Sequence, residues 1–236
     1  MKAFKNVSVY VEGKGIVKSS VYFDEKIEKI GGCMKGAEEI SLPEGAVVLP
    51  GFIDEHIHGA GGSDAMDGTT KDLSIIAETV AKEGTTTFLA TTMTQSKENI
   101  LKAMRAVKEY RETGSEKGAR IAGIHLEGPF IAAAHKGAQP LEYVAAPNAE
   151  VFDEYNEASG NCIKIITLAP EVDGAIGFIR HLKEKGVLVS IGHTGAKCTE
   201  VLQAMDAGAT NITHTYNAQS PLHHREIGVV GSALLL

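Results

Sequence analysis

The sequence predicts an α/β fold, a (β/α)8 barrel of the TIM type that follows a small β-sheet portion. From residue 51 onward, apolar and β-branched segments alternate with amphipathic segments that end at a glycine, as at Gly84, Gly186 and Gly208. A strand followed by a helix, repeated in this way, is typical of a parallel sheet. Polar residues suited to catalysis follow several different strands, which favours a barrel over an open sheet, where they would gather near one switch point.

Residues 1–49 are expected to form a small β-sandwich portion. They contain short extended segments separated by glycines or charged turns, and none of these segments has helical periodicity. The segments are KNVSVYV, KSSVYF, EKIEKIGG and GAVVLP. We therefore expect a first domain over residues 1–49 and a barrel over residues 50–236.

The barrel region contains six predicted strands with helices between them. The strands are FIDEHIH, TTTFLATTM, RIAGIHLEG, CIKIITLAP, VLVSIGHT and TNITHTYN. Apolar residues at helical spacing mark two of the helices, namely Leu73, Ile76, Ala77 and Val80 in one and Val201, Leu202 and Met205 in the other. A complete barrel has eight strands in about 250 residues, so we expect the sequence to stop two strands short.

The composition excludes several classes of protein. The 236 residues include 23 Lys and Arg against 30 Asp and Glu, and this net charge of −7 argues against nucleic-acid and anionic-membrane partners. Cys33, Cys162 and Cys198 lack CxxC spacing, which favours a reducing compartment. No apolar segment has the length of a signal peptide core or a membrane span. We therefore expect a cytoplasmic protein.

Two histidines lie at the end of the first barrel strand, in the segment DEHIHG. Residues i and i+2 of a strand point to the same side, so His56 and His58 can both face one metal ion. The alternative is an ordinary pair of polar residues at a strand end. We favour metal ligands, with Asp54 orienting the pair from behind.

Three further candidates follow later strands. Glu127 ends the strand in IHLEGPF, while His193 and His214 end the strands in VSIGHTGA and NITHTYNA. One Glu or His at a strand end is more often a rim, cap or structural residue, but five such groups at the carboxyl ends of barrel strands indicate one site. Mixed nitrogen and oxygen ligands suit zinc or iron and suit calcium or magnesium poorly. We expect one or two such ions.

The remaining polar residues give weaker signals. His135 and His181 are expected to face solvent. His223, His224 and Arg225 form a cationic run that is either a surface turn or an anion site, because an Arg guanidinium binds phosphate or carboxylate in bidentate fashion. No GxGxxG, Walker A or GxSxG pattern occurs, so no dinucleotide site, P-loop or serine nucleophile elbow is predicted.

Four motifs together resemble the N-acetylglucosamine-6-phosphate deacetylases, a family within the amidohydrolase superfamily. They are PGFIDEHIHGAGGSDAMDG, HLEGPF followed by KGAQ, SIGHTGA, and THTYNAQSPLHHREIG. The resemblance implies a metal-dependent barrel beside a small β-sandwich, usually in a homodimer. It also implies a hydrolase that cleaves the linear amide of N-acetylglucosamine 6-phosphate into glucosamine 6-phosphate and acetate, a step of amino-sugar metabolism.

The resemblance also assigns roles to residues. It makes Glu127, His193 and His214 the principal metal ligands, and His56 and His58 the ligands of a second ion. Implied substrate contacts are Ala138, Gln139, Asn217 and Ala218 for the sugar, and His224 and Arg225 for the phosphate, with Arg225 serving the neighbouring subunit. The family's catalytic aspartate is expected beyond Leu236, so no catalytic residue is assigned within the sequence.

Two alternatives remain open. One is another amidohydrolase that acts on a cyclic amide, as dihydroorotase-like enzymes do. Many of these use a carbamylated Lys at a strand end, whereas Lys164 lies in the middle of its strand. The other is an inactive, truncated barrel that binds a metal or a partner without turnover. The missing aspartate supports it, and the 236-residue chain alone is not expected to turn over substrate.

Overall fold

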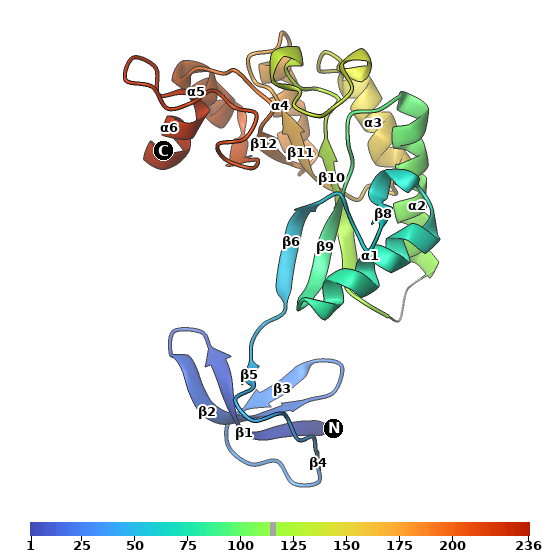
Figure 1. Cartoon of the computed structure of the whole chain (residues 1–236), viewed down its shortest axis with the longest axis vertical. Coiled ribbons are helices and arrows are strands. Elements are labelled where there is room, and N and C mark those ends of the chain that lie inside the picture. Colours follow the sequence, from blue (N-terminus) through green and yellow to red (C-terminus); the bar gives the residue numbers. More distant parts are fainter. Residues whose placement is uncertain (114–116) are drawn as a thin grey trace. The chain divides into compact units, whose positions relative to one another are not determined.

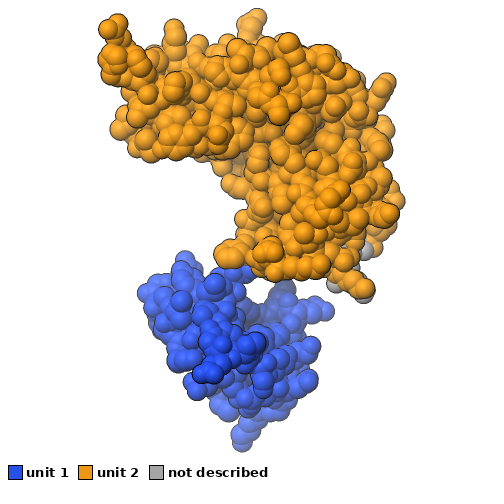
Figure 2. All heavy atoms as spheres, in the orientation of Figure 1, with its two compact units in different colours: residues 1–51 blue, residues 52–236 orange. Residues whose placement is uncertain are grey.

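The computed structural model describes residues 1–113 and 117–236. Within it, the chain divides into two compact units, residues 1–51 and residues 52–236, coloured blue and orange in Figure 2. None of the described helices is long and apolar enough to span a membrane.

The first unit is a five-stranded sheet with the order β3-β2-β1-β4, and β5 also pairs with β1 (Figure 1). Its strands are β1 (Lys2–Val11), β2 (Gly15–Phe23), β3 (Ile27–Ile30), β4 (Glu38–Glu39) and β5 (Val47–Val48). Ala3, Val9, Val21 and Tyr22 are its buried apolar side chains. Among the described residues, the portion expected to be part of a β-sandwich is this one five-stranded sheet.

The second unit contains a sheet of six parallel strands, and all six match the strands expected from the sequence. They are β6 (Phe52–Ile57), β9 (Thr85–Thr91), β10 (Arg120–Glu127), β11 (Ile163–Leu168), β12 (Leu188–Ile191) and β13 (Ala209–Ile212). Each strand pairs with the one before it, so the spatial order follows the chain order from β6 to β13. A doubly wound sheet would reverse its order at a switch point. This sheet is a half-barrel, which confirms the predicted fold class.

Helices connect the strands and cover the sheet (Figure 1). They are α1 (Thr70–Lys82), α2 (Lys97–Thr113), α3 (Ala149–Ala158), α4 (Ala175–Glu184), α5 (Cys198–Ala207) and α6 (Gly228–Leu235). Helix α1 buries Leu73, Ile76, Ala77 and Val80, as its spacing predicts. Helix α5 differs, because it buries Val201 with Ala204 and Ala207 and leaves Leu202 and Met205 exposed. Small alanines let α5 approach the sheet closely, so its bulkier residues stay outside.

Short elements shape the end of the barrel where the strands finish. The hairpin of β7 (Gly59–Ala60) and β8 (Ser63–Asp64) follows β6, and the 3-10 turn Ala65–Asp67 comes next. After β10, a long segment contains the 3-10 turns Ala133–His135 and Leu141–Tyr143. Its Ala132 N–H donates to the carbonyl of His193, which ties this segment to the end of β12.

Gly128 begins that long segment, directly after Glu127. Its φ is +74°, and a Cβ at this position would lie 2.0 Å from the Thr94 hydroxyl oxygen. Only glycine fits both the left-handed backbone and the close approach. The chain can therefore turn sharply at the end of β10 while Glu127 stays inside the barrel.

Candidate metal centre

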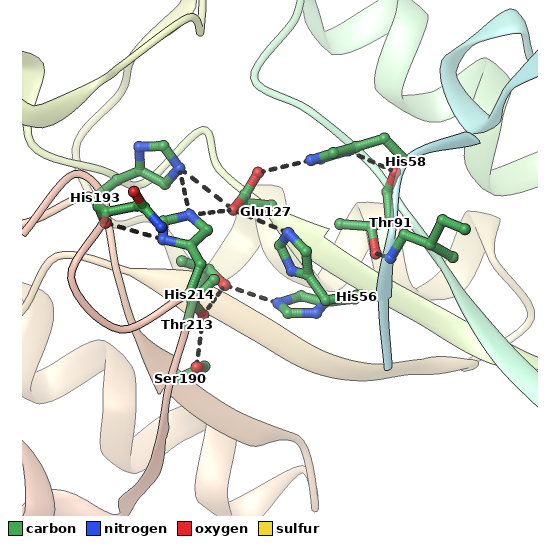
Figure 3. Close-up of polar contacts among 12 residues, drawn as sticks. His56, His58, Thr91, Glu127, Ser190, His193, Thr213 and His214 are labelled. Atoms are coloured by element: carbon green, nitrogen blue, oxygen red, sulfur yellow. Dashed lines mark hydrogen bonds and ion pairs between the residues drawn. The ribbon is translucent and has the colours of Figure 1, made fainter. Parts of the chain in front are cut away.

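Glu127 lies at the centre of a cluster of four histidines from three other strand ends (Figure 3). Its side chain is 3% exposed, so its carboxylate is shielded from water. Oxygen Oε1 lies 3.2 Å from His214 Nε2, 3.3 Å from His193 Nε2 and 3.7 Å from His56 Nε2. Oxygen Oε2 lies 3.2 Å from His58 Nε2. The five residues expected to be metal ligands are thus brought together.

Backbone carbonyls orient three of these rings. The Nδ1 atoms of His58, His193 and His214 lie 3.2, 2.8 and 2.9 Å from the carbonyl oxygens of Thr91, His135 and Asn217. A carbonyl oxygen only accepts, so each Nδ1 carries a proton, and Nε2 is the ring nitrogen left to face Glu127 or a metal ion. This is the pattern of metal-binding histidines, whose second nitrogen donates to a carbonyl or carboxylate.

The nitrogen and oxygen atoms fit a divalent cation. The Nε2 atoms of His193 and His214 are 3.1 Å apart, too close for two N–H groups that point at each other. Ligand atoms about 2.1 Å from a tetrahedral ion lie about 3.4 Å from one another, close to the separations observed here. A positive ion among Glu127, His193 and His214 therefore satisfies lone pairs that would otherwise face one another.

The ligand atoms form two groups that share Glu127. One contains His56, His58 and Glu127, the other Glu127, His193 and His214, and within each group the atoms lie within 4.8 Å of one another. Because Glu127 belongs to both groups, its carboxylate could serve both. The residues present therefore suit one or two metal ions.

The electrostatics of the cluster favour a cation. Burial alone would raise the pKa of Glu127, but hydrogen bonds from His193, His214 and His58 hold that pKa well below its usual range. Hydrogen bonding to Glu127 in turn raises the pKa of His58 and of His214. Burial lowers the pKa of His56. Glu127 therefore keeps a negative charge inside the barrel, where a positive partner stabilises it.

The backbone is strained at two ligands. His193 and His214 have φ angles of +48° and +33°, in the left-handed region that non-glycine residues rarely adopt. Glu171, which follows β11, holds the turn after His193, because its carboxylate accepts hydrogen bonds from the Gly195 N–H at 2.6 Å and from the Thr194 hydroxyl. Such strain persists only where surrounding contacts impose it and is concentrated at functional sites.

Hydrogen bonds of its own hold the end of β6, the strand that carries His56. Thr91 Oγ1 accepts a hydrogen bond from the Ile57 N–H at 2.9 Å, which joins β6 to β9 beside His56 and His58. Asp54, expected to support this pair, accepts a hydrogen bond from the His56 N–H at 3.0 Å. His56 Nδ1 is buried and has no hydrogen-bond partner among the described residues.

His125 is a buried polar residue that the sequence interpretation did not single out. Its Nδ1 lies 2.8 Å from the Glu55 carbonyl oxygen and its Nε2 lies 2.7 Å from Thr167 Oγ1. Burial lowers its pKa to about 4, so the ring is neutral near pH 7. Because it precedes Glu127 by two residues, it faces the same side of β10. That spacing was the available signal.

Gln139, expected to contact the sugar, lies against the metal ligands. It is 2% exposed, and its Oε1 accepts a hydrogen bond from the Thr94 N–H at 2.8 Å, which fixes the orientation of the amide. Its Nε2 then donates to Glu127 Oε2 at 3.1 Å. Gln139 therefore orients the carboxylate in this structure. The neighbouring Ala138 is exposed.

The other expected substrate residues lie at the rim. Asn217 and Ala218 use their carbonyl oxygens to bind His214 Nδ1 and the Thr194 N–H, so they support the ligand loops. His224 and Arg225 are exposed, and Arg225 Nε donates to His224 Nε2 at 3.1 Å.

His135 and His181 were expected to face solvent, but both are half-buried. The carbonyl oxygen of His135 supports His193, whereas His181 pairs with Asp153 on the outer surface at 3.1 Å. Neither side chain joins the cluster around Glu127.

The chain is similar in sequence and in structure to known proteins. The Amidohydrolase family model matches residues 47–233. An N-acetylglucosamine-6-phosphate deacetylase of Bacillus subtilis (strain 168) is 46% identical over 200 residues, which are 84% of this chain and 50% of that protein. The solved N-acetylglucosamine-6-phosphate deacetylase of Pasteurella multocida has a TM-score of 0.85 at 31% identity, over 99% of this chain and 62% of that one.

A mutant deacetylase of Mycobacterium smegmatis was solved in complex with N-acetyl-D-glucosamine-6-phosphate. It has a TM-score of 0.85 at 26% identity, over 98% of this chain and 60% of that one. The chain spans about half the length of the curated relatives it matches.

Proposed function

The chain belongs to the amidohydrolase family, and from this premise we propose that it serves the metal-dependent deacetylation of N-acetylglucosamine 6-phosphate. The reaction is hydrolysis of a linear amide, and its products are glucosamine 6-phosphate and acetate. The observation that carries the proposal is the convergence of four Nε2 atoms on the buried Glu127 carboxylate. The names of the relatives supply the substrate.

The metal would be zinc or iron, because the ligands combine imidazole with a carboxylate. Glu127, His193 and His214 would hold one ion, and His56, His58 and Glu127 would hold a second. When bound, such an ion would lower the pKa of water toward about 7 and polarise a carbonyl group. The carbonyl acceptors at Thr91, His135 and Asn217 keep the ring nitrogens of His58, His193 and His214 aimed at this position.

The substrate would lie against the rim of the barrel. Gln139 and Ala138 on the long segment after β10, and Asn217 and Ala218 after β13, would contact the sugar. The exposed guanidinium of Arg225, with His224 beside it, would bind the phosphate, since a guanidinium binds phosphate in bidentate fashion. We also propose a homodimer and a cytoplasmic location, with Arg225 serving the partner's site.

Amide hydrolysis also needs a general base, and we assign none among the described residues. Asp54 lies two residues before His56, and its Oδ1 already accepts a hydrogen bond from the His56 N–H. It therefore supports the strand end instead of facing a substrate. The family resemblance gives the role of base to an aspartate on a later barrel strand.

The cyclic-amide alternative is less well supported. Enzymes of that kind commonly need a lysine that bridges two ions, and Lys164 is the lysine on β11. Its side chain is exposed, while its neighbours Ile163 and Ile165 are buried.

The test is acetate release by the protein purified from its native host and loaded with zinc or iron. We expect turnover of N-acetylglucosamine 6-phosphate, and loss of that turnover when a chelator removes the metal. Dihydrouracil, a cyclic amide, should not be hydrolysed. Hydrolysis of dihydrouracil without acetate release, or deacetylation that survives complete metal removal, would overturn the proposal.

A further inference from the structure

A line of buried hydrogen bonds crosses the barrel interior below the metal ligands. It runs from Ser190 Oγ to Thr213 Oγ1 at 2.6 Å, from there to Thr167 Oγ1 at 2.7 Å, and on to His125 Nε2 at 2.7 Å. It ends where His125 Nδ1 meets the Glu55 carbonyl oxygen at 2.8 Å. The four side chains are at most 5% exposed, and the Ser190–Thr213 end is visible in Figure 3.

The line has one direction. The Glu55 carbonyl only accepts, so His125 Nδ1 carries a proton, and Nε2 of the neutral ring must accept from the Thr167 hydroxyl. Thr167 then accepts from Thr213, which accepts from Ser190. Thr213, Thr167 and His125 each have a donor on one side and an acceptor on the other. A buried network of this kind fixes the positions of its members.

The line joins strands that the backbone does not join. Among the described residues, backbone pairing links β6 only to β9, and β13 only to β12, so these two strands lie at opposite ends of the sheet. His125 lies on β10 and contacts Glu55 on β6, whereas Thr213 directly follows β13. The line therefore connects the two ends of the half-barrel across its interior.

Two members of the line are one residue from a candidate ligand. Glu55 precedes His56 and Thr213 precedes His214, while Glu127 follows His125 by two positions. A cavity of about 100 Å³ is lined by Glu55, His56, His125, Ser190, Thr213 and His214. Packing does not fill this space, so the His125–Glu55 hydrogen bond is the side-chain contact that joins the His56 side of the cavity to β10.

We propose that His125 is a positioning residue that sets the place of His56 and His58 relative to Glu127 through its contact with the Glu55 carbonyl, and so makes the second metal site. The inference rests on the proposed function only in requiring that the cluster binds metal. It predicts that the contact of His125 with the Glu55 carbonyl is the one that matters for the His56 and His58 site.

Two substitutions separate the contacts of His125. An Asn amide can occupy the place of Nδ1, so His125→Asn keeps a donor for Glu55 and loses the Thr167 contact. A Gln amide reaches the place of Nε2, so His125→Gln keeps the Thr167 contact and loses the donor for Glu55. Thr92→Val is the matched control, because the Thr92 hydroxyl is buried nearby without a hydrogen-bond partner.

The measurement is zinc binding by the purified protein, titrated with Zn²⁺ and checked by elemental analysis. Wild type, Thr92→Val and His125→Asn should bind two ions. His125→Gln should bind the first ion normally and the second about 10- to 100-fold more weakly, the usual cost of losing a contact behind a ligand. Equal affinity for the second ion in His125→Gln and Thr92→Val would overturn the proposal, as would a wild type that binds one ion.

A spectroscopic readout keeps the test independent of folding defects in variants. Long-range ¹H–¹⁵N spectra of the wild-type protein should show the His125 ring protonated on Nδ1 and bare on Nε2. The opposite tautomer would overturn the proposal. Failure of the acetate-release assay, with the zinc pattern intact, would count against the proposed substrate and not against the role of His125.

Discussion

His214 Nε2 lies 3.2 Å from Glu127 Oε1, although the two residues are 87 positions apart in the sequence. Glu127 ends β10 and His214 follows β13, and two strands lie between them in the sheet. Parallel strands are about 4.8 Å apart, so in a flat sheet these residues would be about 14 Å from each other. They can meet only because the sheet curves around them, which makes the cluster a product of the barrel curvature.

Because both ligand groups share Glu127, we predict that Glu127→Gln abolishes binding of both ions. The amide lacks the negative charge that offsets two cations, and its NH₂ group cannot ligate. His58→Gln should instead abolish only the ion on the His56 side. Elemental analysis of dialysed proteins measures both effects. His181→Gln, on the outer surface, is the control and should leave the metal content unchanged.

Two ions retained in Glu127→Gln would show that the histidines alone hold them. Loss of both ions in His58→Gln would show that the two groups do not bind separately.

The fold could be predicted because local patterns carry it. Apolar strands and glycine-terminated helices specify a parallel sheet, and the candidate ligands were singled out because barrel strands present functional residues at their carboxyl ends. In α5, however, Val201, Leu202 and Met205 all fit an apolar face by spacing, and only Val201 is buried. Which side of a helix meets the sheet depends on close packing by Ala204 and Ala207, which spacing alone does not reveal.

The supporting residues could not be predicted for a related reason. Gln139 and Glu171 reach their partners Glu127 and Gly195 only after the segments that follow β10 and β11 fold over the ends of the strands. His125 lies inside an apolar strand, where a buried histidine is commonly structural. Their roles follow from long-range contacts, which have no local signature in the sequence.

Glu171 offers a test of the strained turn at His193. We predict that Glu171→Ala weakens binding of the first ion by about 10- to 100-fold, because the Gly195 N–H and the Thr194 hydroxyl lose their acceptor and the His193 ring is no longer held. Glu171→Gln keeps one acceptor oxygen and should lose less. Isothermal titration with Zn²⁺ measures the affinity for this ion.

Asp173→Ala is the control, because it removes an exposed carboxylate two residues from Glu171, and it should bind Zn²⁺ like wild type. Equal losses of affinity in both alanine variants would refute the role of Glu171.

Glu226 provides a pH-dependent contribution to stability outside the metal cluster. Its Oε1 accepts hydrogen bonds from the Cys198 and Gly228 N–H groups at 3.0 Å each, at the starts of α5 and α6, and these bonds lower the pKa of Glu226. A carboxylate with a lowered pKa stabilises the fold above its unfolded pKa of about 4.5, and this contribution is lost as the pH falls through the folded value.

Glu226→Gln should therefore lower Tm by a few degrees at pH 7, and the difference from wild type should shrink as the pH falls below about 4.5. Thermal unfolding followed by circular dichroism measures both values. Glu184→Gln, at the end of α4, is the control and should not change Tm. A gap that stays constant down to pH 3 would mean that the charge of Glu226 does not stabilise the two helix ends.

Arg225 tests the proposed phosphate contact. It is exposed, and its Nε donates to His224, so its terminal guanidinium nitrogens remain able to take an anion. Hydrogen bonds to a charged group contribute about 1.5–3 kcal/mol, so Arg225→Ala should raise KM for N-acetylglucosamine 6-phosphate by about 10- to 100-fold. KM for unphosphorylated N-acetylglucosamine should hardly change, because that sugar has no anion for Arg225 to bind.

Arg180→Ala, on the outer face of α4, is the control and should leave both KM values unaltered. The measurement is KM of the metal-loaded Arg225→Ala protein for both sugars. A change in KM by the same factor for both would show that Arg225 has a structural role, whereas a phosphate contact changes KM for the phosphorylated sugar alone.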